Sequence, residues 1–79
     1  MPHYYFHLHE QAGTVKDPEG RALENAASAR NHAVIAARSI MSENVLTGFL
    51  DLSDYVEVTD ELGDLVLVVS FEEAVTCFM

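Results

Sequence analysis

Residues 55–70 read YVEVTDELGDLVLVVS, and this stretch decides the fold. Apolar and polar residues alternate over 55–59, which is typical of a strand with one buried face. Gly63 lies in a predicted turn over 60–63, and residues 65–70 predict the returning strand of a β-hairpin. With Thr59 opposite Asp64, the predicted core face consists of Val56, Val58, Leu65, Leu67 and Val69. The other face then carries Tyr55, Glu57, Thr59, Val66 and Val68.

A second strand signal begins the chain, where residues 3–9 read HYYFHLH. The strict alternation places Tyr4, Phe6 and Leu8 on one side of this strand. The other side carries His3, Tyr5, His7 and His9. Gly13 permits a turn into a short return strand over 14–16, and residues 17–20, DPEG, match a type I turn.

A long helix is predicted between these two strand regions. Asn25 is a suitable N-cap, and Gly48 is a suitable residue just past the last turn. One face of this helix is apolar and consists of Ala26, Ala27, Ala29, Ala33, Val34, Ala36, Ala37, Ile40, Met41 and Val45. Arg30 interrupts this face, where it is expected to cover the sheet edge with its stem or to pair with a carboxylate, and Ile35 lies on the polar side.

A short helix is expected near the C-terminus, because Ser70 and Glu73 fit a capping box. Its predicted apolar face consists of Phe71, Ala74, Val75 and Phe78. The order of elements is β(β)αββ followed by this short helix. The sequence therefore predicts a single α+β domain over residues 1–79. It has two layers, with a small, mostly antiparallel sheet of three or four strands and one long helix packed on one face.

The charge of the chain limits its partners. Its 79 residues include 13 Asp and Glu but only four Lys and Arg, which gives a net charge of −9 with histidines neutral. Eight of the acidic residues lie in residues 49–79, a segment without Lys or Arg. Such a surface repels phosphate groups, which argues against direct nucleic-acid binding, and its charge would suit a basic protein partner.

Cysteine content and hydropathy indicate the compartment. Cys77 is the only cysteine, and a lone thiol is typical of a reducing environment, where it acts as a small hydrophobic residue. The N-terminus lacks the pattern of a signal peptide. The longest uninterrupted apolar run covers only residues 65–69, far short of the ~20 residues that span a bilayer. We expect a soluble cytoplasmic protein with no membrane partner.

The histidines of the first strand are candidate metal ligands. His7 and His9 are two residues apart on one face, so their Cα atoms lie about 6.5–7 Å apart, and two imidazoles at that distance can chelate a transition metal. His3 is about 13 Å from His7 by the same strand rise, too far to share the ion. Because a structural zinc site uses four ligands, His7 and His9 are weak candidates, and no metal or cofactor is expected.

No catalytic residue is predicted. Ser39 and Ser42 lie on the polar face of the long helix, and His32 shares that side without a third group to orient it as a base. All four glycines are isolated, so the sequence contains no phosphate-binding loop. The acidic run from Asp51 lacks the glycine that an EF-hand requires at its sixth position. We expect that the protein is not an enzyme.

The sheet face that turns away from the long helix is the predicted interaction surface. It is expected to expose His3, Tyr5, His7, His9, Tyr55, Val66 and Val68. An apolar and aromatic patch rimmed by charge marks an interaction site, and a domain this small gains buried area by dimerising. The C-terminal helix, a second copy of the chain and a different partner are the three candidates for covering it. We expect a homodimer.

The order of these segments resembles a family of short uncharacterised bacterial proteins, which is a domain of unknown function. The resemblance rests on the segments MPHYYFHLHE, DPEGRAL, the Ala-rich helix and LDLSDYVEVTDELGDLVLVVSFEEAV. They match an M-P-x-Y-Y-F-x-L start, a D-x-E-G turn, an Ala- and Arg-rich helix, and an E-V-x-D-E-x-G hairpin ending in F-x-E-A-V. The resemblance covers nearly the whole chain and supports a single domain, and it supplies no activity, cofactor or catalytic residue to carry over.

Three functional hypotheses follow from the sequence. The first is a non-enzymatic protein-interaction module that acts through the open sheet face. The second is an antitoxin-like or regulatory inhibitor that binds a basic partner surface through its acidic C-terminal half. The third is a small metal-binding protein that uses His7 and His9.

Overall fold

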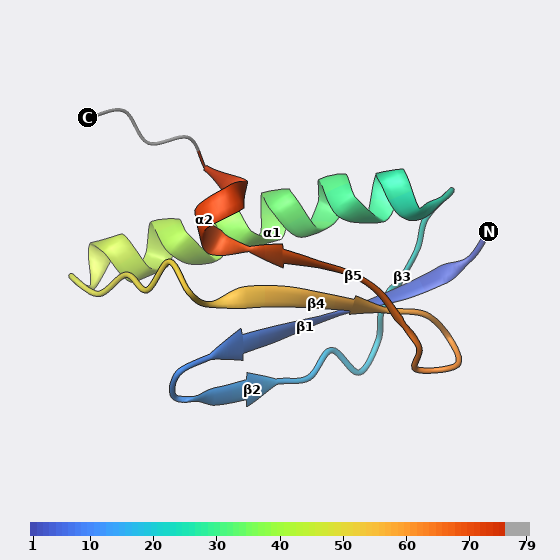
Figure 1. Cartoon of the computed structure of the whole chain (residues 1–79), viewed down its shortest axis with the longest axis horizontal. Helices are drawn as coiled ribbons and strands as arrows, with labels where there is room; N and C mark the ends of the chain where they lie inside the picture. Colours follow the sequence, from blue (N-terminus) through green and yellow to red (C-terminus); the bar gives the residue numbers. More distant parts are fainter. Residues whose placement is uncertain (76–79) are drawn as a thin grey trace.

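The fold is an antiparallel sheet with two helices on one side (Figure 1). The computed structural model describes residues 1–75. Its elements, in chain order, are β1 (His3–Glu10), β2 (Gly13–Val15), β3 (Arg21–Ala22), α1 (Ala26–Leu46), β4 (Tyr55–Thr59), β5 (Leu65–Ser70) and α2 (Phe71–Ala74). The sheet order is β2-β1-β4-β5, and β3 also pairs with β1. The α+β prediction is confirmed, and β3 is a strand that the sequence did not predict.

Helix α1 begins and ends where its capping residues predict. Asn25 Oδ1 accepts a hydrogen bond from the amide of Ser28 at 2.9 Å, which satisfies one of the free amides of the first turn. After Thr47, Gly48 adopts a φ of +82°, a left-handed conformation that stops the helix. The residues of α1 that are buried recur every fourth position: Ala29, Ala33, Ala37 and Met41. The apolar face is therefore narrower than predicted, because Ala26, Ala27 and Val45 are exposed.

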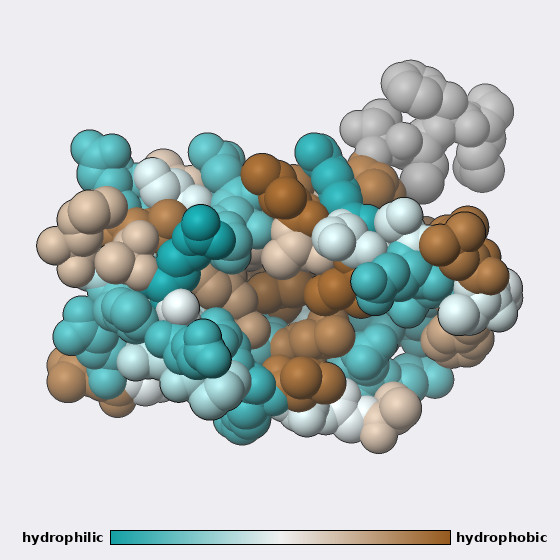
Figure 2. Space-filling view, turned by 180° about the vertical axis from the view of Figure 1, so that it is seen from behind, coloured by the Kyte–Doolittle hydropathy of each residue, from teal (hydrophilic) through white to brown (hydrophobic). Residues whose placement is uncertain are grey.

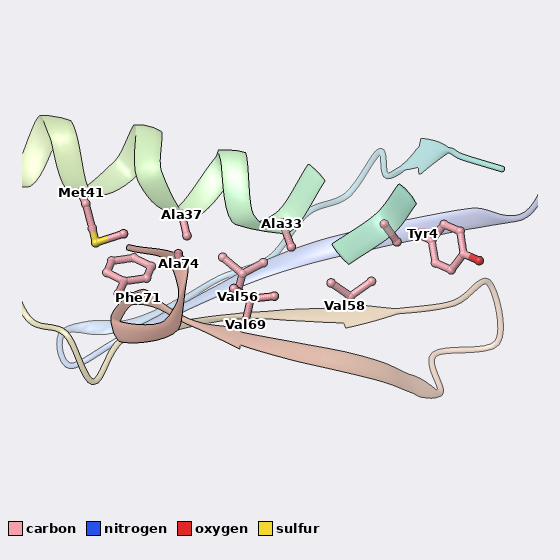
Figure 3. Close-up of a cluster of buried hydrophobic side chains, with 10 residues drawn as sticks. Tyr4, Ala33, Ala37, Met41, Val56, Val58, Val69, Phe71 and Ala74 are labelled. Atoms are coloured by element: carbon pink, nitrogen blue, oxygen red, sulfur yellow. The ribbon is translucent and has the colours of Figure 1, made fainter. Parts of the chain in front are cut away.

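The core lies between α1 and the central strands (Figure 3). Val56, Val58 and Val69 are fully or almost fully buried and point toward the alanines of the helix. Because alanine is small, the helix backbone approaches these valines closely and leaves no gap for larger side chains. Phe6 and Leu8 of β1 pack against the margin of this cluster and remain partly accessible.

Helix α2 completes the core at the end of β5. Ser70 Oγ accepts from the amide of Glu73 at 3.1 Å, and Glu73 Oε1 accepts from the amide of Ser70 at 2.8 Å, which confirms the predicted capping box. Phe71 and Ala74 are buried beside α1 (Figure 3). The predicted roles of Cys77 and Phe78 lie outside the described residues.

Two arginines of α1 contact α2. Arg38 Nε donates to the carbonyl of Ala74 at 2.6 Å. Arg30 lies 3.6 Å from a carboxylate oxygen of Glu73, so the pairing expected of this arginine is confirmed. Both helices consequently occupy the same side of the sheet, and α2 does not cover the opposite face.

The register of the hairpin differs from the prediction. Asp60, not Thr59, lies opposite Asp64, and the two are joined by a hydrogen bond from the Asp60 amide to the Asp64 carbonyl at 3.0 Å. Leu65 therefore faces Thr59, and the ladder shifts before Val58 faces Leu67. This shift is a β-bulge, which inserts one unpaired residue, Val66, into β5.

The bulge exchanges the positions of two side chains. Leu65 was predicted in the core but lies on the face of Thr59 and is 62% exposed. Val66 was predicted on the open face but packs against the core cluster. Val68, opposite Glu57, lies on the open face as the alternation predicts. No helix within residues 1–75 combines the length and apolar character needed to cross a membrane.

Candidate functional site

The sheet face that turns away from α1 and α2, here called the open face, carries a stripe of aromatic and histidine side chains. His3, Tyr5, His7 and His9 alternate along β1 on this side. The antiparallel register places Thr59 beside Tyr5, Glu57 beside His7, and Tyr55 beside His9. Because cross-strand neighbours project from the same face, these seven residues form one continuous surface over the two central strands.

The rings of this surface are stacked on one another. The Tyr5 and His7 rings are parallel within 4°, with centroids 6.4 Å apart, and the His9 and Tyr55 rings stack across strands at 4.7 Å. His3 lies against Tyr5 at 5.3 Å. The side chains are half-buried, and these contacts restrict their conformations before any partner binds.

Both ring nitrogens of His7 and of His9 have protein partners. The amide of Asp17 donates to His7 Nδ1 at 3.1 Å, so neutral His7 carries its proton on Nε2 and donates it to Thr59 Oγ1 at 3.1 Å. His9 Nε2 lies 3.2 Å from Glu57 Oε1, and its Nδ1 lies 3.1 Å from Thr14 Oγ1. A metal ion bound by this pair would have to displace one of these bonds on each ring.

The histidines do not converge on a common point. His3 Nε2 lies 2.8 Å from the carbonyl oxygen of Glu19. Within residues 1–75, no three His, Cys, Asp or Glu side chains lie close enough together to hold a metal ion. His32, predicted on the exposed side of α1, instead packs edge-on against Phe6 with ring centroids 4.5 Å apart. Burial and, next, the charge of Arg21 lower the pKa of His32, while Asp17 opposes this shift.

The carboxylate of Asp17 accepts hydrogen bonds from three backbone amides, a structural role that the sequence did not predict. Its Oδ2 accepts from the amide of Phe6 at 3.1 Å, and its Oδ1 accepts from the amides of Glu19 and Gly20 at 3.2 and 3.1 Å. Burial opposes ionisation of this carboxyl, but the three amides and the nearby His7 outweigh it, so the pKa of Asp17 lies below its ordinary value. The DPEG segment is thus a clamp that fastens the 17–20 loop to β1, and not only a turn.

Gly20 allows this loop to approach β1 closely. Its φ is +67°, and a Cβ at this position would lie 2.7 Å from the carbonyl oxygen of Tyr4 and 2.8 Å from ring carbons of His3 and Tyr5. No residue with a side chain fits there without displacing the strand. In the sequence, the glycine of the DPEG pattern is the feature that could have indicated this close approach.

A second surface lies where the β1–β2 turn approaches the segment after α1. A pocket there is lined by Glu10, Gln11, Ala12, Phe49 and Asp54. Asp54 is only 4% exposed, and burial followed by the charge of Asp51 raises its pKa, although a hydrogen bond from the Gln11 backbone opposes the shift. Figure 2 shows hydrophobic residues at this end of the molecule, where Val45, Leu46, Phe49 and Leu50 are exposed.

Comparison with known proteins places the chain in one family. Residues 3–72 match the family described as "Domain of unknown function (DUF6894)", so the chain belongs to that family. No curated protein and no solved structure shows significant similarity to it. Membership agrees with the resemblance inferred from the segment order and supplies no activity.

Proposed function

We propose that this member of the DUF6894 family is a non-enzymatic protein-interaction module, and that its open face binds the open face of a second copy to form a homodimer. The observation that carries this proposal is the two stacked ring pairs of the open face, Tyr5 with His7 and His9 with Tyr55, which both helices leave uncovered. Fixed aromatic side chains bind at a low cost in conformational entropy, because they lose little freedom on contact.

Charge favours the open face for self-association. The chain carries a net charge of −9, so two copies repel each other across most orientations. Glu57 is the only acidic residue among the seven open-face residues of β1 and β4 named above, and it is paired with His9. Two open faces therefore meet with less repulsion than any pair of surfaces from the acidic hairpin turn.

Placement in the cytoplasm is part of the same proposal. The single cysteine suits a reducing compartment, where a disulfide would not staple so small a domain. Dimerisation is then a means of adding the buried area that a 79-residue chain lacks.

Sedimentation of the wild-type chain and of two charge-insertion variants tests the proposal. At tens of micromolar the wild-type protein is expected to sediment as a dimer, and Tyr55→Glu as a monomer, because each open face would then bring an unpaired carboxylate to the contact. Ile35→Glu, on the outer side of α1 where Ile35 is 64% exposed, is the matched control and should remain dimeric.

Thermal unfolding of both variants shows whether the fold is kept. A wild-type monomer at these concentrations would overturn the dimer. A dimer that survives in Tyr55→Glu but dissociates in Ile35→Glu would move the contact from the open face to α1.

A further inference from the structure

The outer edge of β5 is a strand edge that none of the described residues covers. β5 is the last strand in the sheet order, and no described strand pairs with its far side. Its six residues, LVLVVS, contain no charge, no proline and no glycine. Such an edge offers free backbone groups to an added strand, and proteins usually blunt it with charge, proline or a covering loop.

The hydrogen-bond pattern identifies which backbone groups point outward. The amide of Phe71 donates to the carbonyl of Asp54 at 2.9 Å, so this opposed pair is a hydrogen-bonded one. Hydrogen-bonded and non-hydrogen-bonded pairs alternate along an antiparallel ladder. Val69 therefore points its backbone toward β4, whereas Val68, opposite Glu57, points its amide and carbonyl away from the sheet.

The accessible part of the edge is confined to its middle and its beginning. At the end of β5, the amide of Ser70 is already occupied by Glu73 Oε1. Val68 is 44% exposed and Leu65 is 62% exposed, so an added strand would find apolar side chains beside the free backbone groups. The edge accordingly has room for about four to five residues of an extended segment.

The charges around this edge select the occupant. Asp60 and Asp64 precede β5, and Glu72 follows it. Glu61 instead accepts from the amide of His3 in β1, and Glu73 is engaged by the amide of Ser70 and by Arg30. Arg30 and Arg38 of α1 are both engaged by α2, through Glu73 and the carbonyl of Ala74 respectively. If two copies paired antiparallel through β5, the acidic turn of each would meet the acidic end of the other, which is repulsive.

We infer that β5 binds an extended segment of a partner protein that is apolar in its centre and basic at both ends, by antiparallel strand addition. The added strand pairs with the outward amide and carbonyl of Val68, and its Lys or Arg residues meet the acids at each end of β5. Main-chain hydrogen bonds supply the affinity of such additions, and the flanking charges supply the choice of partner.

Two synthetic peptides test this inference. Each has a centre of five alternating Val and Thr residues, and they differ in carrying two Lys or two Glu at each end. At low salt the Lys-flanked peptide is expected to bind at least about tenfold more tightly than the Glu-flanked one, and to slow amide exchange at Val68. Equal binding of the two peptides would overturn the assignment of a basic partner.

Variants at one position separate strand addition from other modes. Val68→Pro removes the outward amide, a change that an edge strand tolerates. It should weaken binding of the Lys-flanked peptide at least about tenfold. Val68→Thr keeps the amide and the β-branched shape and should bind like the wild type. Unchanged binding to a folded Val68→Pro variant, or no slowing of Val68 exchange in the wild-type complex, would overturn strand addition.

The Lys-flanked peptide also distinguishes this site from the proposed dimer contact. Tyr55→Glu should still bind the Lys-flanked peptide, and a saturating amount of this peptide should leave the wild-type dimer intact, because the peptide occupies the β5 edge and not the open face. Dissociation of the wild-type dimer by the Lys-flanked peptide, with the dimer of Tyr55→Glu retained, would show that a second copy occupies the β5 edge, contrary to the inference.

Discussion

Along the outer edge of β1, the amide of Phe6 donates to the carboxylate of Asp17 at 3.1 Å, whereas along the outer edge of β5 no described side chain or loop receives the amide of Val68. The β1 edge is closed over its whole length, because β2 pairs with its end, β3 pairs with its beginning, and the 17–20 loop fills the interval. The β5 edge has only the capped amide of Ser70.

One short chain thus covers the outer strand edge at one side of its sheet and leaves the edge at the other side open. Unpaired strand edges invite association, and a charged or covered edge prevents it. At β1, a four-residue loop, a half-buried carboxylate and a glycine close the edge against pairing. At β5 the same sequence supplies none of these, and it places acidic residues only beyond the strand ends.

Removing the clamp should have the largest effect. Asp17→Ala leaves the amides of Phe6, Glu19 and Gly20 without their acceptor, and we expect a loss of about 3 kcal/mol in the free energy of unfolding. Urea denaturation measures it. Glu19→Ala, an exposed neighbour in the same loop, is the control and should change stability by less than about 0.5 kcal/mol. Equal effects of the two substitutions would mean that the clamp does not hold the edge.

The clamp also predicts a pH dependence. The pKa of Asp17 is lower in the folded chain than its ordinary value of 3.8, so its contribution is complete above that value and is lost as pH falls through the folded pKa. The difference in stability between the wild type and Asp17→Ala should therefore shrink in acid. A difference that grows on acidification would contradict an ionised acceptor.

Adding a side chain at Gly20, where the loop meets β1, should reduce stability by a smaller amount. Gly20→Ala combines a left-handed φ with a Cβ 2.7 Å from the Tyr4 carbonyl, and about 2 kcal/mol of stability should be lost. Gly63→Ala is matched in φ, at +82°, but meets nothing within 4 Å, so it should lose only about 1 kcal/mol. Thermal unfolding of the pair isolates the contact. A smaller loss for Gly20→Ala than for Gly63→Ala would show that the loop is not tightly seated.

Local signals in the sequence were sufficient for the elements themselves. Alternation in β1 and β4, the Asn25 cap and the Ser70 capping box each depend on neighbours within a few residues, and each is confirmed. The stripe of His3, Tyr5, His7 and His9 likewise follows from the period of a strand, so its position on the open face was predictable.

The features that the sequence did not reveal depend on contacts between distant segments. The bulge at Val66 follows from closing the hairpin at Asp60 instead of Thr59, and both closures satisfy the same alternation of residues. The bond from Phe6 to Asp17 joins two segments 11 residues apart through a side chain, which periodicity does not report. The narrow buried face of α1 was not predictable for the same reason, because it depends on where the helix packs on the sheet.

Amide hydrogen exchange of the free chain tests the contrast between the edges most directly. Relative to their intrinsic rates, the Phe6 amide should exchange at least about a hundredfold more slowly than the Val68 amide, because only the former is bonded. The Val69 amide, which points toward β4, should be as slow as that of Phe6 and shows that β5 itself is formed. Equal protection of Val68 and Phe6 in the free chain would contradict the open edge at β5.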